Sequence, residues 1–154
     1  MPESNPHTIT NLGSFALLIC KALQAHGIEP DRLLAQAGID RAAVEQADSR
    51  LDRAQVIALW HSAREFTQDP YIGLKAASFF TPSTFSALGL AMAASKNGLD
   101  ALQRLVRFSQ VISNGSVVSL DQKNGLVIVT HHHIVNVSKQ KYFHGIECIF
   151  AISL

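Results

Sequence analysis

The chain has 154 residues, about the length of one domain, which leaves little room for two full domains. Hydrophobic residues make up 47% of the sequence, enough to fill a core, and this excludes intrinsic disorder. Charged residues reach only 16%, against about 25% in an average soluble domain, so either much of the exterior is buried against a partner or part of the native cover is missing. The formal net charge is only +1, which excludes a strong overall electrostatic attraction to nucleic acid or to an anionic membrane.

The N-terminal segment shows no targeting signal. Residues 1–8 are polar, with an acid where a signal peptide carries basic residues, and are expected to form a disordered leader. The longest apolar run, Phe15 to Cys20, has six residues, far fewer than the ~20 needed to span a bilayer. Cys20 and Cys148 match no zinc or redox spacing and suit a reducing compartment. We therefore predict a cytoplasmic protein with no membrane partner.

Apolar residues at helical spacing predict about six helices before residue 115. Glycines suited to left-handed stops, and Asp or Asn caps, mark the ends of several of them. These elements are a helix over Leu12–Leu23 ended by Gly27, a helix over Asp31–Ala37 ended by Gly38, a brief turn capped by Asp40 through Val44, and a helix begun by Asn97 and Asp100 that reaches Ile112.

The segment Leu51–Val56 contains the clearest helix start. Asp52 is expected as the N-cap, with Gln55 three residues later returning a hydrogen bond to the amide of the cap. The apolar stripe continues through Trp60. The solvent side is assigned to Arg53, His61 and Arg64.

Two further helices are predicted between residues 69 and 95. Asp69-Pro70 favours a helix with proline at its first position, where the missing amide costs nothing. Ser83 is expected to cap a helix through Met92 that is apolar on nearly every side and therefore buried between layers. Gly89 within this helix predicts a close approach of another backbone segment.

The periodicity changes from helical to alternating at residue 115. Residues 116–122 and 126–130 flank Asn124-Gly125, the strongest short signal for a β-hairpin. A two-residue turn here pairs Lys123 with Leu126, Leu120 with Val129, and Val118 with His131. The predicted fold is α+β, with a helical N-terminal half packed on a small antiparallel sheet that contains the 116–130 hairpin.

The last segment, from Ser138 to Leu154, is again helical in pattern. It is apolar to its end and has no stop signal, which is unusual for the end of a natural domain. We therefore expect residues 9–154 to form one domain that is cut short at its C-terminus.

Six segments occur in an order that resembles a known family. They are His26–Pro30, Leu33–Ile39, Leu51–Val56 with Leu59-Trp60, Asp69–Leu74, Phe85–Gly89 and Ala101–Leu105. Together they resemble the N-terminal regulatory domain of a branch of the AraC/XylS transcription regulators, the arabinose-binding-like kind. The resemblance runs from about Asn11 to Leu154.

The resemblance implies a sensory module. In that family the regulatory domain binds a small effector, dimerises, or does both, and controls a C-terminal helix-turn-helix domain. No basic recognition helix occurs in this chain, so contact with DNA is expected only through a domain outside it. Effector binding would act by population shift, favouring one arrangement that a dimer or interdomain contact passes on.

Aromatic and polar side chains suggest where an effector would bind. Such pockets are apolar with a few converging polar groups. The candidates are Trp60, Phe79, Phe80 and Phe85, with His61 or Tyr142. The alternative is that these aromatic residues are ordinary core.

The histidine run at 131–133 is a weak candidate for a metal site. In a strand, His131 and His133 share a face and could hold one ion, which His144, Glu147 and Cys148 of the last helix would complete. The alternative is a polar strand end with incidental histidines, and no metal or other cofactor is expected. No nucleophile motif or phosphate-binding loop occurs, so we predict that the protein is not an enzyme.

The sequence therefore predicts the sensory and dimerisation domain of a cytoplasmic, bacterial AraC-type regulator. The expected partners are a small-molecule effector and a second copy of the chain. Two alternatives remain open, a ligand-free oligomerisation module of such a regulator and a small metal-binding sensor.

Overall fold

The computed structural model describes residues 8–46 and 48–133. Most of the expected leader, residues 1–7, and the expected helix from Ser138 lie outside this part. The described elements in chain order are β1 (Thr10–Leu12), α1 (Ser14–Ala25), α2 (Asp31–Gln36), α3 (Arg41–Glu45), β2 (Arg50–Asp52), α4 (Arg53–Thr67), α5 (Ile72–Ala77), η1 (Pro82–Phe85), α6 (Ser86–Ala93), α7 (Gly98–Phe108), η2 (Ser109–Val111), β3 (Ser116–Lys123) and β4 (Leu126–His133).

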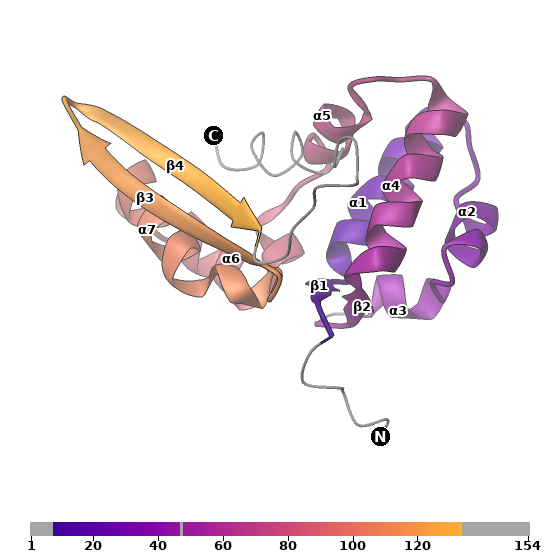
Figure 1. Ribbon diagram of the computed structural model, residues 1–154, viewed down its shortest axis with the longest axis horizontal. Coiled ribbons are helices and arrows are strands. Elements are labelled where there is room, and N and C mark those ends of the chain that lie inside the picture. The colour runs from indigo at the N-terminus through magenta and orange to yellow at the C-terminus, as the bar shows by residue number, and fades with distance from the viewer. Residues whose placement is uncertain (1–7, 47, 134–154) are drawn as a thin grey trace.

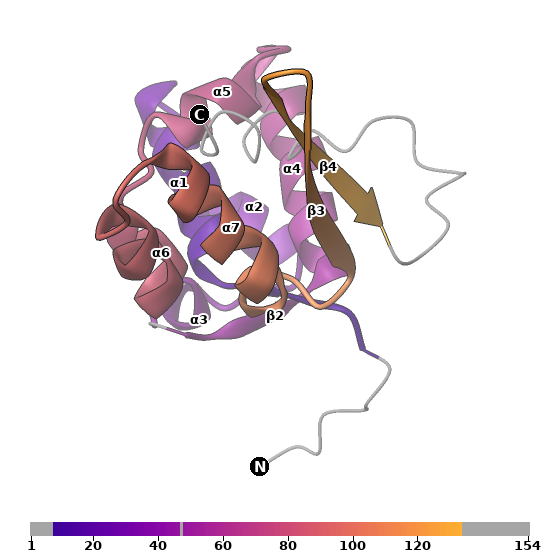
Figure 2. The same ribbon diagram turned by 90° about the vertical axis from the view of Figure 1, so that its left-hand side faces the viewer.

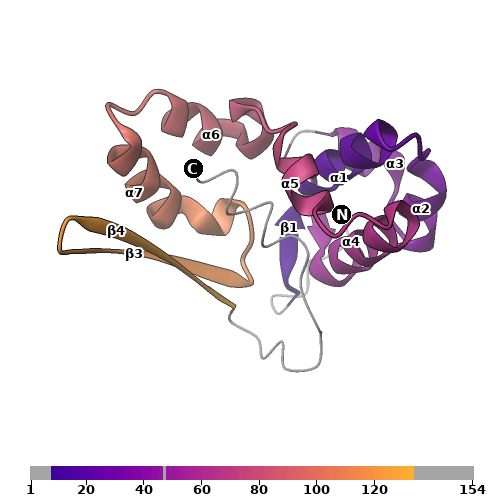
Figure 3. The ribbon, with the colours of Figure 1, turned by 90° about the horizontal axis from the view of Figure 1, so that it is seen from above.

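These elements form two groups that lie side by side (Figure 1, Figure 3). The first contains α1 to α5 with the short antiparallel pair β1–β2, and the second contains α6, α7 and the β3–β4 hairpin. The α+β class is confirmed. The described strands form two separate two-stranded antiparallel sheets, and the predicted hairpin packs beside α7 (Figure 2).

The core lies around α1, which packs against α4 and α5. Helix α1 is apolar on more than one side, so seven of its residues are buried. Among its neighbours, Trp60 of α4 and Ile72 of α5 are completely buried. The helical half therefore has its own continuous core, in which Cys20 is also buried.

The expected helix ends are confirmed in this first group. Gly27 and Gly38 adopt left-handed φ angles of 73° and 69° directly after α1 and α2, as stops that only glycine adopts without strain. The carboxylate of Asp40 accepts a hydrogen bond from the amide of Ala42 at 3.0 Å. Asp52 caps α4 through the amide of Ala54 at 2.8 Å, and Gln55 accepts a hydrogen bond from the amide of Asp52 at 3.2 Å.

The predicted role of Pro70 is wrong. Helix α5 begins at Ile72, and Pro70 lies in the turn before it. The reason is the side chain of Asp69, which accepts a hydrogen bond from the amide of Tyr71 at 2.8 Å and contacts His26 at 3.2 Å. Asp69 therefore closes a turn instead of capping the helix.

The helix expected to start at Ser83 is divided in two. Thr81 precedes the short turn η1, and its amide donates to the hydroxyl of Thr84 at 3.1 Å. Ser86 then adopts a positive φ of 52°, which interrupts the helix before α6. Proline at the first position of η1 is the local signal that the Ser83 interpretation overlooked.

The apolar composition of α6 predicts a helix buried between layers, and this prediction is wrong. Only Leu88 and Gly89 are buried, and Leu90 is 59% exposed. The close approach predicted at Gly89 is confirmed, because a Cβ atom there would overlap the carbonyl oxygen of Pro82. Helix α7 begins as predicted, with the Asn97 side chain accepting from the amide of Asp100 at 2.9 Å, but it ends before Ile112.

The hairpin has the predicted register. Lys123 pairs with Leu126, Leu120 with Val129, and Val118 with His131. Asn124 and Gly125 have φ angles of 53° and 76°, the conformation of a two-residue turn that matches the twist of the strands.

The two groups are joined where β1 and β2 meet residues 111–115. The amide of Leu12 donates to the carbonyl of Ile112 at 2.8 Å, and the guanidinium of Arg50 donates to the carbonyl of Val111. Arg53, expected at the solvent side, is instead 8% exposed and donates to the carbonyl of Gly115 at 3.2 Å. Its long side chain crosses to a segment 62 residues away, which helical spacing alone does not reveal.

No helix in the described part of the chain is long and apolar enough to cross a membrane.

Candidate functional site

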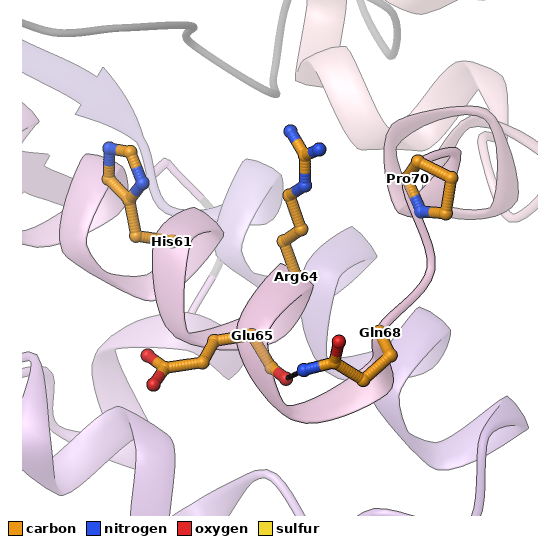
Figure 4. Close-up of a pocket in the computed structure, with 5 residues that line it drawn as sticks. All are labelled: His61, Arg64, Glu65, Gln68 and Pro70. Atoms are coloured by element: carbon orange, nitrogen blue, oxygen red, sulfur yellow. Dashed lines mark hydrogen bonds between the residues drawn. The ribbon is translucent and has the colours of Figure 1, made fainter.

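A pocket of about 530 Å³ lies on the outer side of α4 (Figure 4). Four of its lining residues follow at helical spacing along the second half of α4 and its C-cap, and the fifth comes from the loop to α5. They are His61, Arg64, Glu65, Gln68 and Pro70. Its volume falls in the range of small-molecule sites, but the pocket is open to solvent and four of its five lining side chains are polar.

The end of α4 fixes the shape of the pocket. Gln68 adopts a left-handed φ of 53°, and its amide donates to the carbonyl of Arg64 at 2.9 Å. Its side-chain amide donates to the carbonyl of Glu65. The hydroxyl of Thr67 donates to the carbonyl of Ala63 at 2.8 Å. These bonds give partners to carbonyl groups that the end of a helix otherwise leaves without them. The wall of the pocket is therefore a helix C-terminus whose last carbonyl groups are hydrogen-bonded.

The side chains around the pocket extend in two directions. Figure 4 shows the imidazole of His61 and the guanidinium of Arg64 extending to the same side of α4, toward which Pro70 also lies. The carboxylate of Glu65 and the amide of Gln68 extend to the other side. The pocket therefore has one cationic side and one edge with an acidic group.

Trp60, the residue before His61, lies in the core under this face of α4. It is completely buried, and its indole N–H has no hydrogen-bond partner among the described residues. A buried donor without a partner costs about 1–3 kcal/mol. Trp60 is the sole tryptophan of the chain, so its fluorescence reports on α4 alone.

The three phenylalanine candidates lie elsewhere, and none lines the pocket. Phe85 is buried and stacks on Phe15 with ring centroids 5.7 Å apart, and Phe80 meets Phe85 edge-on at 4.9 Å. Phe79 is partly buried, with the ammonium of Lys75 5.6 Å from its ring centre. Phe85 therefore belongs to the core, and Phe79 and Phe80 pack against its edge, while Tyr142 lies outside the described residues.

Of the predicted effector residues that the structure describes, His61 lines the pocket and Trp60 is buried in the core. Sequence reasoning did not propose Arg64, Glu65, Gln68 or Pro70. Residues 61, 64, 65 and 68 recur at helical spacing and are all polar, and that stripe was a usable signal. The predicted solvent side of the helix includes His61 and Arg64 of this stripe.

The histidines of β4 gather no metal ligands in the described part of the chain. His131 is partly buried opposite Val118, and His133 pairs with Ser116. No group of three or more His, Cys, Asp or Glu side chains there could hold an ion. His144, Glu147 and Cys148, which were expected to complete the site, lie outside these residues.

Cys20 has no reactive surroundings. It is 1% exposed, and burial raises the pKa of its thiol to about 11. A thiol in this state is a poor nucleophile.

Comparison with known families identifies the class of this domain. The family described as the arabinose-binding domain of AraC transcription regulators, N-terminal, matches residues 27–154. This match covers most of the chain, so the chain belongs to the family of N-terminal arabinose-binding domains of AraC transcription regulators. No curated protein matches the chain.

Proposed function

We propose that this domain binds a small-molecule effector in the pocket on α4 and thereby regulates a DNA-binding domain of the same regulator. The observation that carries the proposal is the pocket itself, an open pocket of about 530 Å³ on a helix that also contacts the second group of elements. Membership in a family of regulatory domains supports this function over catalysis.

Helix α4 offers a route for the signal. Its first turn carries Arg53, whose guanidinium contacts Gly115 just before the hairpin, and its last turns carry the pocket. Arg53 and Arg64 are about 16 Å apart along the helix axis, given a rise of 1.5 Å per residue. An effector that favours one position of α4 would shift the hairpin relative to the helical core by population shift.

The expected output has two parts. The regulated DNA-binding domain would be a helix-turn-helix domain outside this sequence, and a homodimer would transmit the bias to two half-sites. The domain itself would bind no DNA and catalyse no reaction, and a cytoplasmic, bacterial setting is proposed with it.

A ligand screen tests this function. The purified chain is screened against a metabolite library by thermal denaturation and by the fluorescence of Trp60. A true effector raises the midpoint of unfolding by linkage, and His61→Ala weakens its binding while the exposed-site variant Arg104→Ala does not. If no compound shifts either signal, or if hits bind equally well to the His61 variant, the pocket is not the effector site.

A ligand-free oligomerisation module is the second candidate. Four apolar side chains of the hairpin are between 43% and 66% exposed, namely Val117, Leu126, Val127 and Ile128. Exposed apolar surface of this kind is typical of protein interfaces. Analytical ultracentrifugation separates the two candidates, because a pure oligomerisation module would dimerise in the absence of any compound and fail the ligand screen.

A further inference from the structure

The boundary between the two groups of elements is polar, unlike the core around α1. We call the contacts of residues 8–12 and 50–53 with residues 111–115 the polar junction. We infer that this junction opens and closes, and that the second group rotates about Ser86 as it does so. The inference goes beyond the proposed function, because the rotation needs no ligand.

Buried polar side chains concentrate at the polar junction. The described part of the chain buries five polar or charged residues, and all of them lie on the segments of the junction or directly beside them, namely Asn11, Arg53, Ser109, Ser113 and Ser116. The apolar cluster around α1 contains none of them. The junction is therefore a different kind of contact from the core, made of directional bonds and little apolar burial.

The bonds of the junction are ones that water can replace. The amide of Thr10 donates to the side-chain oxygen of Asn114 at 2.7 Å, and the side-chain amide of Asn114 donates to the carbonyl of Thr8 at 3.2 Å. The guanidinium of Arg50 donates to the carbonyl groups of Thr10 and Val111. Asn114 and Arg50 are both exposed, so water can take the place of either partner and the net stabilisation from each bond is small.

The closed junction also holds an unsatisfied polar group. Asn11 is 9% exposed, and its side-chain oxygen has no hydrogen-bond partner among the described residues. A buried acceptor without a partner is destabilising, and water would bind it in a more open arrangement. Closure is therefore less favourable than the bonds across the junction suggest.

Ser86 connects the two groups and is strained. It adopts a φ of 52° and a ψ of −136°, a conformation that favours glycine. The turn η1 before it is held by α1, because Phe85 stacks on Phe15 with ring centroids 5.7 Å apart. The hydroxyl of Ser14 also donates to the carbonyl of Thr84. Helix α6 begins at Ser86, so the strained residue lies where the fixed turn meets the second group (Figure 3).

Packing of α6 on η1 keeps Ser86 in this conformation. The backbone at Gly89 lies so close to Pro82 that a Cβ atom would overlap its carbonyl oxygen. When α6 moves off η1, Ser86 can relax to a negative φ, so the strain favours the open arrangement. Leu88 and Leu105 of the second group are buried in the same apolar cluster as α1, and the movement is therefore a rotation and not a separation.

Distances between two spin labels test the rotation. The labels are attached through Gln36→Cys on α2 and Gln103→Cys on α7, two exposed positions, in a Cys148→Ser background in which Cys20 is buried. Pulsed electron resonance of the unliganded protein gives the populations of the closed and open arrangements. Arg50→Gln combined with Asn114→Ala removes side-chain bonds of the junction and is expected to raise the open population about tenfold.

Substitutions at Ser86 assign the pivot. In the junction variant, Ser86→Gly relieves the strain and is expected to lower the open population by about fivefold or more, whereas Ser86→Ala keeps a Cβ atom and leaves it unchanged. Gln122→Ala, on the exposed part of β3, is the control for Asn114→Ala and leaves the distances of the parent protein unchanged. Thermal melts confirm that each variant is folded, and Asn114→Ala alone is measured if the double variant does not fold.

The outcomes separate this inference from the proposed function. One unchanged distance in every folded variant would overturn the rotation, and an open population that Ser86→Gly does not lower would overturn the pivot at Ser86. If the populations respond as expected but no metabolite binds, the rotation stands and the effector function fails. If a metabolite binds at the pocket while the distances never change, the effector site stands and the rotation is wrong.

Discussion

The buried guanidinium of Arg53 donates a hydrogen bond to the carbonyl oxygen of Gly115 at a distance of 3.2 Å. This bond joins the first turn of α4 to the residue before β3, and burial lowers the pKa of Arg53. Gly115 fits closely here, because a Cβ atom at this position would overlap the side chain of Ile9 and lie 3.0 Å from Arg53 Nη1. The contact is therefore a closely fitted link between the two groups of elements, beside the bond from Leu12 to Ile112.

Replacing Arg53 by Ala should destabilise the domain. The carbonyl of Gly115 would remain buried without this donor, which costs about 1–3 kcal/mol. Urea denaturation measures the loss, and hydrogen exchange in β3 should increase more than exchange in α1. Arg104→Ala, on the exposed face of α7, is the control and should change stability by less than about 0.5 kcal/mol. Equal effects of the two variants would show that the Arg53 contact contributes nothing particular.

The capping box of α4 gives a second prediction. Asp52→Ala removes the acceptor for the amide of Ala54 and should lower the free energy of unfolding by roughly 1 kcal/mol. Asp52→Asn keeps an oxygen at the same place and should retain most of the stability. The pair is compared by thermal or urea denaturation, and similar losses in both variants would contradict the capping role.

Local signals predicted the elements whose bonds close within a few residues. The hairpin is an example, since Asn124 and Gly125 determine the turn and the turn determines the register of both strands. The capping box of Asp52 and Gln55 and the helix stops at Gly27 and Gly38 are further examples of such local interactions. In each case the partner atoms lie close together in the sequence, so the pattern contains the whole interaction.

Features that depend on distant partners were not predicted. Arg53 reads as a solvent residue because its acceptor, Gly115, is 62 residues away. Pro70 suggests a helix start, but Asp69 is bonded to His26 of the α1 terminus. The pocket depends on the same loop, because Pro70 completes its lining beside the residues of α4.

Gly89 yields a prediction with an unusual sign. Alanine usually stabilises a helix relative to glycine, by about 0.5–1 kcal/mol. At Gly89 the new methyl group would overlap the carbonyl of Pro82, so Gly89→Ala should instead destabilise the domain by roughly 1–3 kcal/mol. Gly98, in the first turn of α7, is the matched control, because a Cβ there meets no atom within 4 Å. Gly98→Ala should be neutral or stabilising, and the same sign for both variants would refute the close packing of α6 on η1.

Burial of Cys20 predicts a loss of stability in alkaline solution. Its thiol has a pKa raised from the ordinary value of 9.0 to about 11, so the folded state favours the neutral thiol. Below pH 9.0 the thiol is neutral in both states and its contribution to stability is fully present. As the pH rises from 9.0 to about 11, the unfolded chain loses this proton first and the folded state is progressively destabilised.

Two measurements check this behaviour in a Cys148→Ser background, which leaves Cys20 as the single thiol. The free energy of unfolding should fall more steeply above pH 9.0 than it does in the further variant Cys20→Ala, in which no thiol titrates. A disulfide reagent should modify Cys20 slowly in the folded protein and rapidly in urea, because the buried thiol is neutral and covered. Rapid modification of the folded protein at neutral pH would mean that α1 opens readily, and the continuous core around Cys20 would then have to be reconsidered.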